Sequence, residues 1–151
     1  MNKHQRLKEM IIGNRKSLLV RLGFAIPIGV LLFFFLQTET RSLMYGSLMT
    51  VSLLAYGVMI MRESRFMSSF TDHIRAKRVI HIQYVFDYMM VVFICLFFPM
   101  LMKIETISWI PFLVFSLTAL GFLFVERLLD EKVKLIDPEQ PTRRDVKRES
   151  F

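Results

Sequence analysis

Four long apolar stretches constrain the fold of this chain more than any other feature of its sequence. They cover residues 17–36, 43–61, 79–102 and 107–125. A helix that rises 1.5 Å per residue needs about 20 residues to cross a hydrocarbon layer of about 30 Å, and each stretch is close to that length. A soluble domain of 151 residues would bury one core and would not contain four such stretches. The sequence therefore predicts an all-α membrane protein whose four transmembrane helices form a bundle over residues 17–129.

The basic residues outside these stretches indicate the orientation of the chain. Five Lys or Arg residues lie in residues 1–16, five in the connector 62–78, and seven from Glu126 onward. The two other turns carry one each, Arg41 and Lys103. Because cytoplasmic loops are enriched in Lys and Arg, both termini and the connector are expected to be cytoplasmic. We expect a multi-pass protein of a plasma or inner membrane.

The segments beside the first three spans have helical patterns of their own. Residues 1–16 fit either a short amphipathic helix on the membrane surface, ended at Gly13-Asn14, or a solvated basic tail. The connector 62–78 is interpreted as a helical segment that anchors on lipid headgroups, with a docking surface for a partner as the alternative. Basic segments beside a span favour anionic lipid over nucleic acid as the binding partner.

After the fourth span, the sequence predicts that the helix continues out of the membrane. It should stop at Asp137-Pro138, because the residue before a proline disfavours helical geometry. Residues 130–151 are expected to form a cytoplasmic tail. The polar composition of residues 140–151 predicts that this tail is partly disordered.

Asp87 places a carboxylate inside the third span. A charge at mid-membrane costs about 2.5–3.5 kcal/mol on insertion scales, so Asp87 needs a partner or a task. Gln83 and Tyr84 lie on the same helical face, because side chains three or four residues apart are neighbours. One interpretation of this polar stripe is structural, with hydrogen bonds to neighbouring helices. The other is functional, with Asp87 as a proton or cation site in a transport pathway.

Arg21, near the start of the first span, is the candidate partner of Asp87. By helical rise the two residues lie about 6 and 12 Å from the same membrane face, and an arginine side chain can bridge that difference. The alternative is that Arg21 extends to the headgroups. Arg21 shares its side of the helix with Ala25 and Gly29, so the pairing depends on which face of the first span contacts the third.

Small residues and a proline mark the faces on which the first two spans are predicted to pack. The candidate packing residues are Gly23, Ala25, Pro27, Gly29, Gly46, Thr50 and Gly57. Gly46, Thr50 and Gly57 share one face of the second span, and small residues of this kind let helix backbones approach closely.

The sequence contains no recognisable catalytic arrangement. It lacks a Gly-rich phosphate loop, an HExxH pair and a nucleophile elbow, and its histidines are not spaced as haem ligands, so neither a cofactor nor a metal is expected. We therefore expect a non-enzymatic membrane partner: an accessory or regulatory subunit, or a self-assembling membrane effector. The alternative is an oligomeric pore or small transporter for protons, cations or small solutes. Both hypotheses imply a homo-oligomer or a larger complex in the lipid bilayer.

Overall fold

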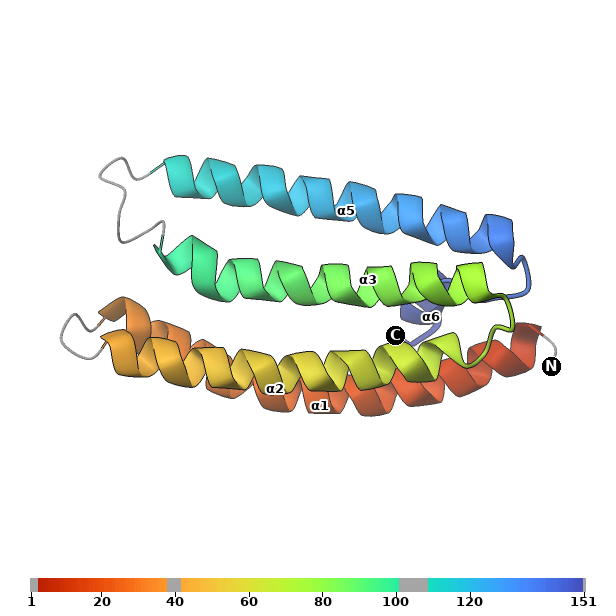
Figure 1. Cartoon of the computed structure of the whole chain (residues 1–151), viewed down its shortest axis with the longest axis horizontal. Coiled ribbons are helices and arrows are strands. Elements are labelled where there is room, and N and C mark those ends of the chain that lie inside the picture. Colours follow the sequence, from red (N-terminus) through yellow and green to blue (C-terminus); the bar gives the residue numbers. More distant parts are fainter. Residues whose placement is uncertain (1–2, 38–41, 101–108, 151) are drawn as a thin grey trace.

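The computed structural model describes residues 3–37, 42–100 and 109–150, and its regular elements in these ranges are all helices (Figure 1). They are α1 (Lys3–Gln37), α2 (Ser42–Ser68), α3 (Ile74–Val92), η1 (Phe93–Phe97), α5 (Ile110–Ile136) and α6 (Arg143–Ser150). The short π-helix η1 continues α3, and the helix runs unbroken to Met100. Four stretches are long and apolar enough to cross a membrane, which confirms the predicted class of multi-pass helical protein.

Parts of the sequence prediction fall outside the described residues. Most of the outer turns expected near 37–42 and 103–106 lie there. So do the last two residues of the third predicted span and the first two of the fourth.

α1 is a single helix that includes the N-terminal segment. The helix end expected at Gly13-Asn14 is absent, because the chain at that point packs against α2. A Cβ atom on Gly13 would lie 2.3 Å from the ring of Phe66, so the absence of a side chain lets the two helices approach closely. With 35 residues, α1 is about 52 Å long and extends beyond a hydrocarbon layer of about 30 Å.

The long helices pack in the order in which they follow in the chain. α1 packs on α2, α2 on α3, and α3 on α5, whereas α1 and α5 share no extensive contact. Figure 1 shows α5 on one side of α3 and the pair α1–α2 on the other. The row is compatible with a helical bundle whose first and last long helices do not pack on each other; at one end of the row, the segment that leads into α6 lies between them.

Buried apolar side chains form two clusters. One contains Leu7, Met10, Ile60, Met67, Ile80, Tyr84, Val133 and Val146, and the other contains Ile28, Met49, Leu53 and Cys95. Ring contacts attach α5 to its neighbour, with centroids 4.2 Å apart between Phe86 and Phe122. None of the 18 most apolar consecutive residues of α5 is buried within the chain, as expected for a helix that faces lipid.

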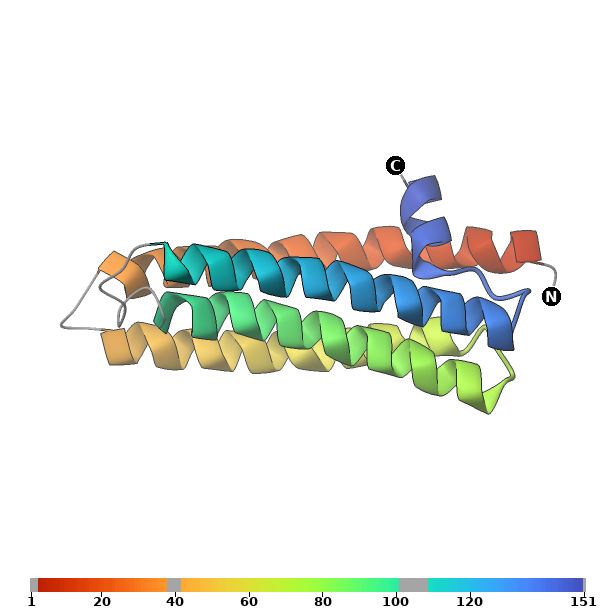
Figure 2. The same cartoon turned by 90° about the horizontal axis from the view of Figure 1, so that it is seen from above.

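The start of α1, the α2–α3 turn and the end of α5 lie at one end of the molecule, which we call the polar end, and α6 lies set back from this end (Figures 1 and 2). The expected connector 62–78 consists mainly of the ends of α2 and α3, joined by a short turn. The predicted continuation of the last long helix to Ile136 is confirmed, and Asp137 caps it.

The segment after α5, expected to be partly disordered, is folded in the structure over residues 137–150. Its apolar and small polar side chains are buried against α1 and the ends of the other helices, with Gln140, Thr142 and Val146 each at most 3% exposed. The Thr71 hydroxyl donates to Asp137 Oδ2 at 2.6 Å, and Arg6 lies 3.5 Å from the same oxygen. These contacts turn the chain back toward the helices.

Candidate functional site

Arg21 forms a bidentate ion pair with Glu63 of α2. Its Nε and Nη2 atoms donate to Glu63 Oε2 and Oε1 at 3.1 and 2.6 Å. The carboxylate is almost fully buried, with 2% of its side chain exposed. The Tyr84 hydroxyl donates a third hydrogen bond to Glu63 at 3.2 Å. A buried charge needs such compensation, since leaving it unpaired costs several kcal/mol.

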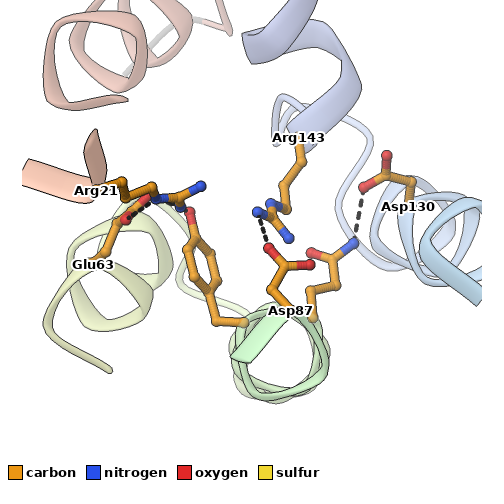
Figure 3. Close-up of polar contacts among 7 residues, drawn as sticks. Arg21, Glu63, Asp87, Asp130 and Arg143 are labelled. Atoms are coloured by element: carbon orange, nitrogen blue, oxygen red, sulfur yellow. Dashed lines mark hydrogen bonds and ion pairs between the residues drawn. The ribbon is translucent and has the colours of Figure 1, made fainter. Parts of the chain in front are cut away.

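Asp87 is paired with Arg143 of α6, not with Arg21 (Figure 3). The Arg143 guanidinium donates to Asp87 Oδ2, and its central carbon lies 4.5 Å from the centroid of the Tyr84 ring. The hypothesis of an Arg21–Asp87 pair is therefore wrong. The physical reason is that Glu63, just beyond the predicted second span, lies closer to Arg21 and binds it bidentately.

Gln83 contacts the last long helix. Its side-chain amide donates to Asp130 Oδ1 at 2.8 Å, and both residues are buried. The three polar residues predicted to share one face of α3 thus contact three different elements: Gln83 binds α5, Tyr84 binds α2, and Asp87 binds α6. Figure 3 shows their partners converging on α3 from both sides.

A cavity of about 190 Å³ lies at this site, between α1, α3, α5 and the segment that leads into α6. Its polar wall is formed by Arg21, Gln83, Tyr84, Asp130, Gln140 and Arg143. Three buried polar atoms of this wall, Asp130 Oδ2, Gln140 Oε1 and Arg143 Nη1, have no hydrogen-bond partner among the described residues. The space and these three atoms suit a few water molecules or one small polar molecule.

The electrostatics of the site hold Arg143 in its charged form. Burial opposes its charge, but the hydrogen bond and the charge of Asp87 outweigh that effect and raise the pKa of Arg143 above its ordinary value. The Asp87–Arg143 pair therefore does not lose its positive partner at physiological pH. Within residues 3–37, 42–100 and 109–150, no three His, Cys, Asp or Glu side chains are grouped as a metal site would require.

The predicted packing residues divide into covered and uncovered positions. Gly46 lies against the Phe35 ring and Gly57 against the Tyr88 ring, where an added Cβ would come within 3.3 and 3.0 Å. Thr50 is exposed and its hydroxyl donates to the Gly46 carbonyl of its own helix. The four positions on α1 are exposed, namely Gly23, Ala25, Pro27 and Gly29. A Cβ on either glycine of this group would meet nothing within 4 Å.

Sequence reasoning missed the partners of the polar stripe. Glu63, Asp130 and Arg143 all lie outside the apolar stretches, where a charged residue is common and does not indicate burial. One signal was present for α6: Thr142 and Asp145 are spaced as in a capping box, which marks a helix start. Comparison with protein families, curated proteins and solved structures finds no match to this chain.

Proposed function

We propose that this chain is a non-enzymatic membrane protein that acts as a partner subunit, and that its binding surface is the part of the side between α1 and α5 that the α6 segment leaves uncovered. The observation that carries the proposal is the row-like packing, in which α1 and α5 have no extensive contact with each other. Helices in a membrane associate through close packing of small residues, so an open side between two spans is a suitable place for another helix.

The uncovered pair Ala25 and Gly29 supports this proposal. Both residues are exposed, and they lie on the side of α1 that carries Arg21, which points toward the other helices. Their four-residue spacing lets a helix backbone approach closely, yet no part of the described chain comes within 4 Å of where a Gly29 side chain would start. A partner helix would use this face.

The internal compensation of charges also favours a partner role over a reaction. Arg21, Asp87 and Arg143 all have oppositely charged partners within the chain. A carboxylate that binds transported cations would have to exchange its partner in each cycle. A permanent ion pair instead stabilises the fold of a subunit.

Site-specific photocrosslinking in native membranes tests the proposal. A photoreactive residue at Ala25 should give one discrete adduct, whose mass identifies a second copy or a different protein. Val30 is the matched control, because it is 50% exposed and lies about 140° around the same helix. Gly29→Leu should reduce the Ala25 adduct. Adducts of equal yield at Ala25 and Val30, or none at either, would contradict the proposal.

A small transporter is the second candidate function, and the cavity beside Arg143 is the observation that favours it. The cavity combines cationic, amide and carboxylate groups at the polar end of the spans. Proton or cation flux in proteoliposomes tests this function, with Asp87→Asn as the variant. Flux that Asp87→Asn abolishes while the protein stays folded would support transport, and flux no greater than in empty vesicles would exclude it for the ions tested.

A further inference from the structure

A second, more open groove runs between α2 and α3. It has a volume of about 690 Å³, and its apolar wall includes Leu54, Val58 and Met61 of α2 and Val85 and Met89 of α3. Leu54, Val58 and Met89 are each more than half exposed, so the chain itself does not cover the groove.

The floor of this groove depends on a glycine. Gly57 has no side chain, and the Tyr88 ring lies so close that a Cβ atom would come within 3.0 Å of it. The Cε2–Cζ edge and the hydroxyl of the tyrosine therefore contact α2 at Gly57. Both residues line the apolar part of the groove, which we call the apolar channel.

Two arginines line the end of the same groove. Arg62 and Arg65 are exposed and follow the apolar residues toward the end of α2. Neither forms an ion pair with the residues that the structure describes, whereas Arg21 and Arg143 are both paired with carboxylates. An adjoining groove that shares Val85 adds Lys77 and Arg78 of α3 to this end.

The length of the groove matches one leaflet of a bilayer. From Leu54 to Arg65 the helix rises about 17 Å. Half of a hydrocarbon layer of about 30 Å is about 15 Å. When the apolar wall lies in the hydrocarbon layer, Arg62 and Arg65 are therefore at the depth of lipid headgroups.

We infer that this groove is a binding site for an anionic phospholipid, with one acyl chain along the apolar wall and the phosphate at Arg62 and Arg65. A soluble anion would use the arginines but not the apolar channel, and a neutral lipid would use the channel but not the charges. Only a negatively charged lipid complements both parts, because basic residues at headgroup depth attract anionic headgroups.

Native mass spectrometry of the full-length protein in mild detergent tests this site. Phosphatidylglycerol should form a discrete adduct, phosphatidylcholine should not displace it, and equal concentrations of inorganic phosphate should leave it intact. The double change Arg62→Gln/Arg65→Gln should weaken phosphatidylglycerol binding roughly 25-fold. The control is Lys8→Gln/Arg15→Gln, which removes the same charge from exposed residues that do not line the groove.

A variant without any change of charge tests the acyl-chain part. Val58→Trp should fill the channel and weaken binding, whereas Leu117→Trp on exposed α5 should not. If the Arg62→Gln/Arg65→Gln protein does not fold, Val58→Trp serves as the test of the site in its place. The inference is overturned if the two charge variants weaken binding equally, if Val58→Trp has no effect, or if inorganic phosphate displaces the lipid.

Discussion

Tyr84 joins the two ion pairs of the site. Its hydroxyl donates to Glu63, and its ring lies beneath the guanidinium of Arg143. A cation over an aromatic face gains about 0.5–2 kcal/mol, depending on how far it is removed from water. Because one side chain contacts both pairs, the loss of a charge in either pair removes a contact of Tyr84 and disturbs the other.

Arg143→Met should destabilise the protein by about 2–3 kcal/mol, because it leaves Asp87 without its counter-ion. The value lies below the range for fully buried pairs, since 29% of the Asp87 side chain is exposed. Thermal unfolding in detergent measures the effect. Arg144→Met on the exposed side of α6 is the control. The double variant Arg143→Met/Asp87→Asn should regain most of the lost stability, because it no longer leaves a buried charge unpaired. If its stability equals that of Arg143→Met, Arg143 acts through packing alone.

The polar residues of α3 could be predicted from the sequence, but their partners could not. Helical spacing places Gln83, Tyr84 and Asp87 on one face without reference to any other segment. Which charge meets Asp87 depends on how α6 folds back, and that is decided by the burial of Val146 and other contacts distant in sequence. Composition alone made the segment that carries Arg143 resemble a disordered tail.

At the scale of elements, α6 is a short helix with a defined start. The Thr142 amide donates to Asp145 Oδ2 at 3.0 Å, and the Asp145 amide donates back to the Thr142 hydroxyl at 3.3 Å. An eight-residue helix is not stable alone, so this cap and the burial of Val146 must hold it. Arg143 is the first residue of α6, and its position follows from the cap.

The stability of α6 should depend on pH through Asp145. Burial alone would raise the pKa of Asp145, but the hydrogen bonds from Thr142 and the charges of Lys134 and Lys3 outweigh it and lower the pKa below 3.8. The stability that the ionised Asp145 carboxylate gives to α6 is therefore fully present above pH 3.8. It is lost as the pH falls through the lowered pKa of Asp145.

Hydrogen exchange of the α6 amides measures this contribution. At pH 7, Asp145→Asn should speed their exchange roughly twofold, because it removes the negative charge near the helix N-terminus while the amide oxygen can still accept from Thr142. In the wild type, acid should speed the exchange of the α6 amides, and in Asp145→Asn this acceleration should be smaller. Glu149→Gln, on the same helix and exposed, is the control. Equal acid sensitivity in wild type and Asp145→Asn would show that another group controls α6.

Two glycines on different helices should respond differently to a larger side chain. Gly57→Leu should lower the free energy of unfolding by about 1–3 kcal/mol, because the Cβ of the leucine would meet the Tyr88 ring at 3.0 Å. Gly29→Leu should change stability by less than about 0.5 kcal/mol, since nothing lies within 4 Å. Chemical unfolding of the purified protein compares them. A larger loss at Gly29 than at Gly57 would contradict the helix neighbours described above.

For the whole molecule, the sequence predicts the number and approximate limits of the long helices, because hydropathy over a window depends only on local residues. It does not predict their neighbours. The helix end expected at Gly13 shows the limit, since a glycine that locally marks a helix end serves here to admit the Phe66 ring of α2. The open side between α1 and α5 likewise depends on packing that no local pattern contains.

Cysteine labelling tests the orientation implied by the basic residues. In a Cys95→Ser background, an impermeant reagent added outside cells should label Gln37→Cys at the end of α1 and should not label Ser69→Cys in the α2–α3 turn. Ser69→Cys should become reactive once the membrane is permeabilised. Labelling of Ser69→Cys alone in intact cells would reverse the orientation.

The pairing of Asp87 with a residue beyond the last span has a consequence for biosynthesis. Arg143 is made 56 residues after Asp87, which takes about 3–11 s at 5–20 residues per second. A third span that enters the bilayer within this interval carries Asp87 without its counter-ion, and the apolar residues around Asp87 must carry the insertion unaided. The nascent chain can complete this ion pair only after all four apolar stretches have been translated.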